Sequence, residues 1–217
     1  MHKNVHNLTL INNQIKLKFG LLENLNIIAV SKTFSIDKID PLIDYGHIHF
    51  GENKVQEALD KWIEKKNSIK FLKLHMVGRL QTNKVKHAVT IFDYIHSLDS
   101  LRLAEKISIE QKKINKDIKI FIQVNLGNEK QKSGINKNEL KEFYDKCKNE
   151  FKLNIIGLMC IPPLDANVRP HFKELSDLNK SLGLKNLSMG MSSDYLDAVD
   201  FGATFIRIGS KIFGNRS

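Results

Sequence analysis

The feature that most constrains the fold of this 217-residue chain is a regular alternation of short apolar segments with amphipathic stretches. Short apolar runs bounded by turn residues are typical of buried strands, and apolar residues at helical spacing are typical of helices. The strands are expected at residues 26–31, 47–50, 71–77, 92–96, 118–125, 153–159, 186–189 and 204–208. The helices between them are expected at 36–45, 53–66, 82–89, 100–114, 137–149, 170–182 and 193–201.

Regular strand–helix alternation requires parallel strands joined by right-handed crossovers. Eight such units over about 200 residues fit an α/β fold of the (β/α)8 TIM-barrel type, with residues 1–217 forming a single domain. A doubly wound open sheet is the alternative. It commonly contains fewer strands, and no G-x-G-x-x-G motif follows the first apolar segment.

The N-terminus predicts an extra helix that plugs or flanks the barrel. Apolar residues recur there at helical spacing, and Gly20 is expected to end the helix or nearly so. The apolar positions are Leu8, Ile11, Ile15, Phe19 and Leu22.

Composition excludes several classes of protein. Hydrophobic residues make up 41% and charged residues 27% of the chain, which is ordinary for a globular protein. No apolar run approaches the roughly 18 residues of a membrane helix, and the N-terminus carries no signal-peptide core. Cys147 and Cys160 are too few for a disulfide framework, so we expect a cytoplasmic protein with no membrane partner.

The net charge of +10 raises the question of an anionic partner. The lysines are dispersed along the chain and are not clustered with aromatic residues. We interpret them as solvated helix faces and expect no nucleic-acid partner. A nucleic-acid-binding barrel is the alternative, and it predicts binding that weakens steeply with salt.

Polar residues at the predicted strand ends indicate a site, because chemistry in a βα barrel gathers where the strands end. The segments SMGMSS and RIGS follow the last two strands and combine glycine with hydroxyl residues. Glycine lets the backbone approach an anion closely, and Ser210 would open a short helix whose N-terminus favours phosphate. The alternative is that these segments are ordinary turns and caps.

Lys32 closes the first apolar segment, facing that predicted phosphate site across the barrel mouth. A partly desolvated lysine has a lowered pKa and supplies the neutral amine needed for a Schiff base with a phosphorylated aldehyde. The alternative is a solvated lysine at a strand end. Arg207 shares strand parity with Gly209, so it is expected to reach into the same mouth. Its alternative is a structural ion pair, for which Glu52 is the candidate partner.

Three histidines lie in or beside the predicted strands. No metal-ligand spacing links them, so we interpret them as polar lining or satisfied core groups and predict no metal site. They are His49, His75 and His96.

From about residue 27 to residue 214, an ordered series of motifs resembles a known family. The motifs are AVSKTFS, HFGENKVQEALDK, LHMVGRLQTNKVK, IHSLDSLRLAEKI, IQVNLGNEKQKSGI, GLMCIP, LSMGMSSDYLDAV and GATFIRIGSKIFG. The chain resembles the pyridoxal 5'-phosphate (PLP) homeostasis proteins, which are similar to a free-standing N-terminal barrel of alanine racemase. The resemblance implies a fold type III barrel with PLP as the cofactor.

The resemblance also implies roles for individual residues. Lys32 matches the lysine that forms an aldimine with PLP, and Arg207 matches the arginine that faces the pyridine nitrogen. Lys84, in LQTNK, matches another motif lysine whose role stays open. The other cofactor-binding residues that it implies are Ser188, Gly209 and Ser210 for the phosphate, with Gly190 assisting, Asn53 near the cofactor, and Met191 and Ser192 in the flanking loop.

The matching arginine favours a carrier over an enzyme. A permanent cation disfavours the proton on the pyridine nitrogen, which makes the ring a weaker electron sink. Alanine racemase works with such an arginine but adds a second domain and a tyrosine from a partner subunit, whereas this sequence ends at Ser217. We therefore expect a monomeric PLP carrier without dedicated turnover that serves PLP-dependent apoenzymes. A racemase-like enzyme acting on amino acids is the alternative.

Overall fold

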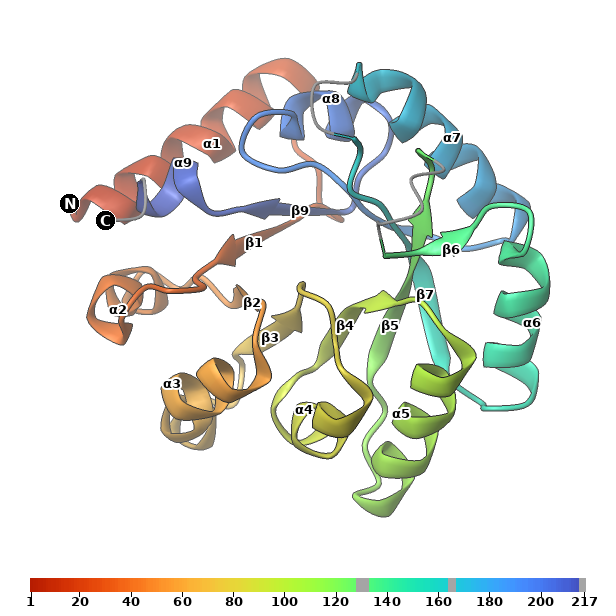
Figure 1. Cartoon of the computed structure of the whole chain (residues 1–217). Helices are drawn as coiled ribbons and strands as arrows, with labels where there is room; N and C mark the ends of the chain where they lie inside the picture. Colours follow the sequence, from red (N-terminus) through yellow and green to blue (C-terminus); the bar gives the residue numbers. More distant parts are fainter. Residues whose placement is uncertain (128–132, 164–166, 215–217) are drawn as a thin grey trace.

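A closed barrel of parallel strands forms the centre of the molecule (Figure 1). The computed structural model describes residues 1–127, 133–163 and 167–214. The strands of the barrel are β1 (Asn26–Val30), β2 (His49–Glu52), β3 (Lys73–Met76), β4 (Tyr94–Leu98), β5 (Lys119–Asn125), β7 (Asn154–Met159), β8 (Asn186–Ser188) and β9 (Phe205–Ile208). Each pairs in parallel with its neighbours, and the pairings of β1 with β9 and β4 with β5 close the ring. The predicted (β/α)8 barrel is confirmed, and the open sheet is wrong.

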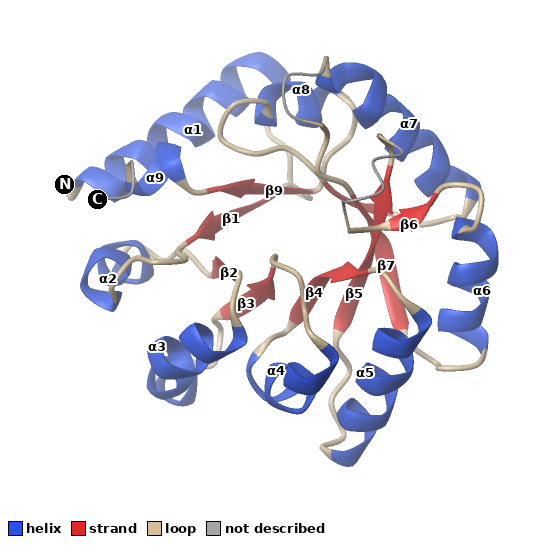
Figure 2. Cartoon of the chain, viewed as in Figure 1, coloured by secondary structure: helices blue, strands red, loops and turns tan. Residues whose placement is uncertain are grey.

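Helices surround the barrel and cover its outer surface (Figure 2). They are α1 (Lys3–Phe19), α2 (Ile36–Asp44), α3 (Val55–Ser68), the 3-10 turn η1 (Thr82–Lys84), α4 (Val85–Ile91), α5 (Leu101–Lys113), α6 (Leu140–Asn149), α7 (Val168–Ser181), α8 (Tyr195–Asp200) and α9 (Ser210–Phe213). Every predicted helix is present, with ends shifted by a few residues. The predicted start of 193–201 moves to Tyr195, so Ser192 and Ser193 belong to the preceding loop.

The strand predictions need correction at three places. The strand expected at 47–50 starts and ends two residues later, because Gly51 and Glu52 continue the ladder between β1 and β3. The strand expected at 92–96 is likewise observed two residues later, because Leu98 still pairs with β5. The sequence also gave no sign of β6 (Ile135–Asn136), a two-residue strand that pairs with the end of β5. A strand this short has no periodicity to detect.

The N-terminal helix α1 flanks the barrel and does not plug it (Figure 1). The side-chain amide of Asn4 donates to a carbonyl of α2 at 2.7 Å, and that of Asn7 donates to a carbonyl of α9 at 2.9 Å. Gly20 caps the helix with φ 77°, so Leu22 lies beyond it and is exposed. The buried positions of the predicted apolar face are Leu8, Ile11 and Ile15.

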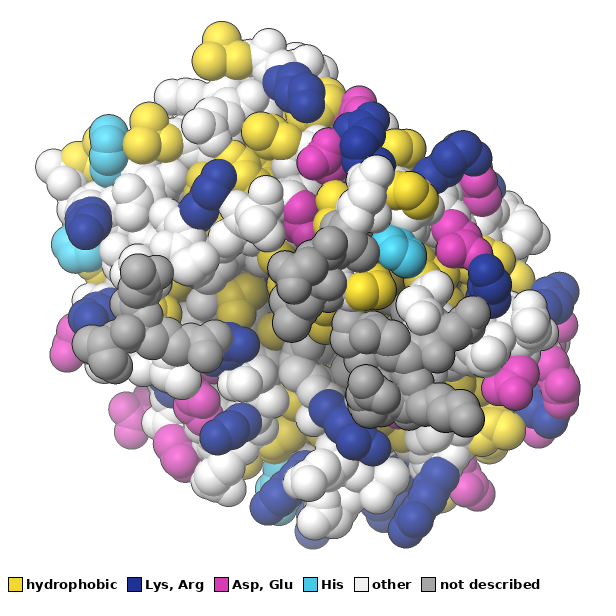
Figure 3. Space-filling view, turned by 45° about the horizontal axis from the view of Figure 1, so that its top comes forward, with side chains coloured by type: hydrophobic (Ala, Val, Ile, Leu, Met, Phe, Trp, Pro, Cys, Tyr) yellow, Lys and Arg dark blue, Asp and Glu magenta, His cyan; other side chains and the backbone are white. Residues whose placement is uncertain are grey.

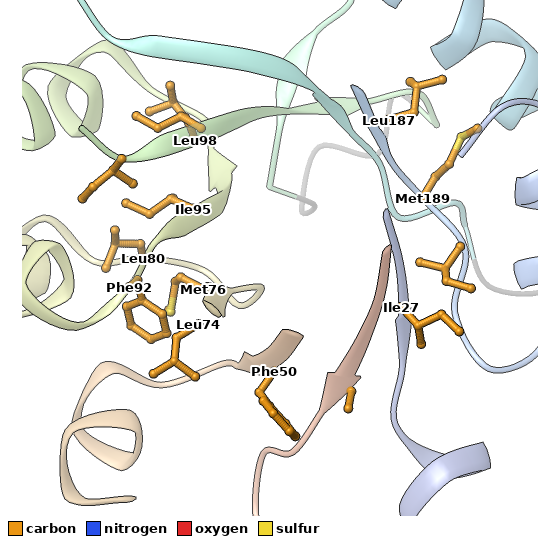
Figure 4. Packing of buried hydrophobic residues seen from close by; sticks show 14 of the residues in the cluster. Ile27, Phe50, Leu74, Met76, Leu80, Phe92, Ile95, Leu98, Leu187 and Met189 are labelled. Atoms are coloured by element: carbon orange, nitrogen blue, oxygen red, sulfur yellow. The ribbon is translucent and has the colours of Figure 1, made fainter. Parts of the chain in front are cut away.

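The apolar core has two parts, one outside and one inside the barrel wall. Figure 4 shows the outer part, where side chains such as Phe50, Leu74 and Phe92 fill the space around the strands. Inside the barrel lie Ile28, Val30, Tyr94, Phe121, Met159 and Phe205. The alternation of the two sets along each strand decides which polar residues reach the interior.

Candidate functional site

A cavity of about 570 Å³ opens at the carboxyl ends of β1 and β9. Six predicted site residues line it together: Lys32, Met191, Ser192, Arg207, Gly209 and Ser210. The remaining lining residues, which the sequence analysis did not single out, are Val30, Phe34, Val77, Ile161, Ser193 and Gly214. The cavity therefore combines an amine, a guanidinium and serine hydroxyls with apolar walls, a donor set that suits a flat ligand with one anionic group.

Lys32 occupies the corner of a tight turn that follows β1. The N–H of Phe34 donates to the carbonyl of Ser31 at 3.1 Å, which makes Lys32 and Thr33 the two central residues. Thr33 has φ 68°, the left-handed conformation that the second central residue takes in a type II turn. This conformation is unusual for a β-branched residue. The ring of Phe34 stacks on Phe213 with centroids 5.0 Å apart, which joins the turn to α9.

Arg207 reaches the cavity from the barrel interior and is only 5% exposed. Its guanidinium donates to the hydroxyl of Ser188 at 2.7 Å and to the carbonyl of Cys160 at 2.9 Å. Burial lowers the pKa of Arg207 from its usual value, but an arginine remains protonated at neutral pH. The ion pair with Glu52 considered from the sequence is wrong, because Glu52 pairs with Lys61 instead.

Ser188 and Gly190 lie behind the cavity and are not among its lining residues. The hydroxyl of Ser188 is fully buried between Arg207 and His96. Gly190 has φ 88°, and a Cβ placed there would lie 2.5 Å from the Cβ of Ala198. Both residues hold the cavity wall from behind, and their contact with a phosphate stays a prediction.

The buried His75 and His96 and the partly buried His49 form a chain of hydrogen bonds that ends at Ser188, and we call it the histidine chain. The ring nitrogens of His49 and His75 are 2.9 Å apart, as are those of His75 and His96, and His96 lies 2.8 Å from the hydroxyl of Ser188. Desolvation lowers the pKa of His49 to about 4 and those of His75 and His96 well below the usual value. The rings are therefore neutral. The polar lining predicted from the sequence forms a connected array of hydrogen bonds that reaches Arg207 through Ser188.

A second polar cluster lies between β2 and α3, and we call it the carboxylate cluster. Oε1 of Glu52, which is fully buried, accepts hydrogen bonds from Ser31 at 2.7 Å, Trp62 at 2.9 Å and Lys61 at 3.0 Å. Lys61 also contacts Glu57 at 3.0 Å. Burial raises the pKa of Glu52, although Lys61 opposes the shift.

Glu57 connects the carboxylate cluster to the Lys32 turn. Its carboxylate accepts a hydrogen bond from the N–H of Thr33 at 2.5 Å. Burial alone raises the pKa of Glu57, but the bonds from Thr33 and Lys61 outweigh it and leave the pKa lowered. The sequence analysis missed Glu57 and Lys61, and their i,i+4 spacing on α3 was the available signal.

Asn53 and Lys84 line a different cavity of about 680 Å³, beside the first. It lies among the loops after β2, β3 and β4 and includes Arg79 and Asp99. Gly78 packs against Asn53, where a Cβ would lie 2.4 Å from the Asn53 carbonyl oxygen. Asn53 therefore lines a different cavity from Lys32, and a cofactor contact of Asn53 stays a prediction.

The cysteines give no second candidate nucleophile. Cys147 and Cys160 are separate buried thiols, and burial raises the pKa of each to about 12. Among the described residues, no three His, Cys, Asp or Glu side chains are grouped as metal ligands. In the same part of the chain, no helix is long and apolar enough to cross a membrane.

Positive charge is spread over the surface. On the face that Figure 3 shows, Lys and Arg side chains stand among Asp and Glu. Several pair with carboxylates one turn away on the same helix: Lys141 with Asp145, Lys146 with Glu142, and Lys173 with Asp177. This distribution agrees with solvated helix faces, and the absence of a nucleic-acid partner stays a prediction.

The sequence matches the family model of the alanine racemase N-terminal domain over residues 6–217. The pyridoxal phosphate homeostasis protein of Aquifex aeolicus is 39% identical over 201 residues, which cover 88% of this chain and 86% of the relative. That of Escherichia coli K12 is 34% identical over 203 residues, covering 89% and 87%. Both relatives align along nearly their whole length.

Solved structures agree with the sequence relatives. PipY of Synechococcus elongatus, solved with PLP bound, superimposes with a TM-score of 0.88 at 33% identity and covers 97% of this chain and 100% of PipY. An alanine racemase of Clostridium difficile shares the fold with a TM-score of 0.77 at 16% identity, and the match spans 57% of that longer chain. The chain therefore belongs to the family of the pyridoxal phosphate homeostasis proteins, whose barrel is that of the alanine racemase N-terminal domain.

Proposed function

We propose that this chain holds PLP as a reversible aldimine on Lys32 and serves PLP homeostasis in the cytoplasm without a turnover of its own. The observation that carries the proposal is the cavity at the ends of β1 and β9, where Lys32 and Ser210 line the same space. PLP supplies an aldehyde that condenses with the lysine amine and releases one water, and hydrolysis reverses the bond. PLP-bound PipY, which matches nearly the whole chain, supports this reading.

The residues around the cavity have distinct tasks in this proposal. Ser192, Gly209 and Ser210 offer hydroxyl and backbone donors to the phosphate, and Ser188 and Gly190 hold that wall in place. Arg207 presents a fixed cation to the ring, because Ser188 and the Cys160 carbonyl orient its guanidinium. The apolar side chains of Val30, Phe34, Val77 and Ile161 pack against the ring faces or exclude water.

The chemistry of the lining residues supports a carrier. A racemase needs an acid–base group on each face of the substrate. Among the described residues that line the cavity there is no Asp, Glu, His, Tyr or Cys. Lys32 carries the one amine of that lining, and Arg207 stays protonated at neutral pH. Monomeric state and transfer to PLP-dependent apoenzymes are further parts of the proposal.

Borohydride reduction of the PLP-loaded protein, followed by peptide mapping, tests the attachment. A pyridoxyl adduct on Lys32 is the expected result, and Lys32→Ala should lose both the aldimine absorbance and the adduct. Lys84→Ala is the matched control, because Lys84 lines the other cavity. A wild-type protein that takes up no PLP, or an adduct that persists in Lys32→Ala, would contradict the proposal.

Proton exchange at Cα of added amino acids in deuterated water tests for turnover. We expect the loaded protein to exchange no faster than free PLP. Exchange that is accelerated by the wild type and lost in Lys32→Ala would show the racemase-like activity instead.

A further inference from the structure

The residues on both sides of Lys32 are hydrogen-bonded to side chains that do not line its cavity. On the side that precedes Lys32, Ser31 is fully buried, and its carbonyl accepts a hydrogen bond from Nζ of Lys61 at 2.9 Å. Its hydroxyl donates to Glu52 at 2.7 Å. On the side that follows, the N–H of Thr33 donates to Glu57 at 2.5 Å.

The hydrogen bonds on the two sides of Lys32 are connected through Lys61. Nζ of Lys61 lies 3.0 Å from Oε1 of Glu52 and 3.0 Å from Oε1 of Glu57, and its side chain is only 9% exposed. One ammonium therefore joins the carboxylate that holds Ser31 to the carboxylate that holds Thr33. Both Glu57 and Lys61 belong to α3, so the turn after β1 is fixed to a helix that follows β2.

The backbone of the turn needs this support. Thr33 has φ 68°, a conformation that L-residues with a branched Cβ rarely adopt and that persists where surrounding contacts impose it. A charge-assisted bond from the Thr33 N–H to Glu57 supplies such a contact. Loss of that bond allows the turn to relax. Lys32 lies between Ser31 and Thr33 in this turn, so it then moves with the turn.

We propose that Glu57 and Lys61 are positioning residues that fix the Lys32 amine where it meets the aldehyde of its ligand, while the phosphate end of the cavity is held independently by other elements. This inference rests on the proposed function. It assigns a task to a charged cluster whose residues are not among those that line the cavity.

Two ligands separate positioning of Lys32 from general damage to the fold. PLP is bound through the phosphate end and through Lys32. Pyridoxine 5'-phosphate carries an alcohol in place of the aldehyde, so it uses the phosphate end but forms no covalent link. Dissociation constants for both ligands are to be measured for the wild type, Glu57→Ala and Glu64→Ala. Glu64 is the matched control because it is exposed on the same helix, two turns beyond Glu57.

Glu57→Ala is expected to weaken PLP binding about tenfold, the effect of losing one hydrogen bond to a charged group. Binding of pyridoxine 5'-phosphate should change by less than about twofold, which lies within the ordinary variation of a surface substitution. Glu64→Ala should leave both constants unchanged. Hydrogen exchange at the Thr33 amide, measured without ligand, should accelerate in Glu57→Ala alone.

A second substitution makes the test specific. Glycine adopts positive φ without the steric cost that threonine bears. Thr33→Gly added to Glu57→Ala should therefore recover most of the lost PLP affinity, which a merely structural role of Glu57 does not predict.

The failures are distinguishable. A wild type that binds neither ligand overturns the proposed function and this inference with it. A wild type that binds both, with Glu57→Ala weakening both equally or with no recovery on adding Thr33→Gly, overturns the positioning role alone.

Discussion

The histidine chain lies inside the barrel and the carboxylate cluster lies outside its wall. Each contains a fully buried polar side chain, His75 in the first and Glu52 in the second, but only the carboxylate cluster carries charge. In the chain, each ring can donate to one neighbour and accept from the other, so the tautomer of His75 is tied to those of His49 and His96. In the cluster, the charge of Glu52 is balanced by Lys61 and by two neutral donors.

The difference in charge between the histidine chain and the carboxylate cluster matches their surroundings. The histidine chain lies among apolar side chains such as Tyr94 and Phe205, where an ionised group would be costly. The carboxylate cluster lies next to a partly exposed helix, where Glu57 keeps 24% of its side chain in solvent. Neutral polar groups therefore support Arg207 from within, and charged groups support the Lys32 turn from the rim.

Removal of Lys61 should produce the largest loss of stability. Lys61→Met leaves the buried carboxylate of Glu52 without its cation, and breaking a buried pair in this way costs about 3 to 5 kcal/mol. Lys65→Met is the control, because the Lys65–Asp40 pair is about one-third exposed on each side and should contribute about 0 to 1 kcal/mol. Urea unfolding measures both, and equal losses would show that the cluster is not a buried charged unit.

Interruption of the histidine chain should cost somewhat less. His75→Phe keeps an aromatic ring against Tyr94, whose centroid is 4.2 Å away, but leaves nitrogens of His49 and His96 without partners. The His96 nitrogen is fully buried and the His49 nitrogen is partly buried, so the loss should be about 1 to 3 kcal/mol in the free energy of unfolding. A variant as stable as the wild type in urea would mean that the rings find other partners.

The histidine chain and Glu52 should change the free energy of unfolding with pH in opposite directions, whereas Glu57, whose pKa is lowered, acts in the same direction as the histidines. His49 has an unfolded pKa near 6.5 and a folded pKa of about 4, so below pH 6.5 the unfolded chain binds more protons and stability falls as pH falls. His75 and His96 act in the same direction. Glu52 acts oppositely, because its raised pKa lets the folded chain bind a proton first as pH falls.

The contribution of His75 can be isolated by comparing the wild type with His75→Phe. Between about pH 6.5 and about pH 5.5, the unfolding free energy of the wild type should fall by up to about 1 kcal/mol more than that of the variant. Urea titrations at the two pH values measure the difference. Parallel slopes would indicate that His75 binds protons equally in the folded and unfolded chains.

Two buried serines give the finest comparison. Ser31 donates to the charged cluster, whereas Ser188 links Arg207 with His96. Ser188→Ala breaks two short hydrogen bonds, of 2.8 and 2.7 Å, whereas Ser31→Ala breaks one of 2.7 Å and a long contact of 3.5 Å with the Gly51 carbonyl. We therefore expect Ser188→Ala to cost about 1 kcal/mol more in urea unfolding. The reverse order would show that the charged cluster depends on every donor more than the neutral chain does.

The barrel could be predicted from the sequence because its strands are buried apolar runs separated by helical patterns. The errors fall where polarity or length conceals a strand. Glu52 is a strand residue despite its charge, because Lys61 and Trp62 satisfy it from a helix, and β6 is too short to show a pattern.

The site could be predicted only in part. Lys32, Arg207, Gly209 and Ser210 lie at the predicted mouth, because strand ends and strand parity place them there. Ser188 could not be assigned in this way, since its partners Arg207 and His96 come from other strands. The bond between Thr33 and Glu57 likewise depends on how one loop meets a neighbouring helix, which periodicity does not describe.

The pairing of β1 with β9 has a consequence for when the cavity can form during synthesis. Lys32 follows the first strand and Ser210 follows the last, and they share a cavity because Asn26 pairs with Phe205 and Ala29 with Ile208. The cavity therefore cannot exist until β9 and Ser210 have left the ribosome. A nascent chain that still lacks β9 cannot hold a ligand there.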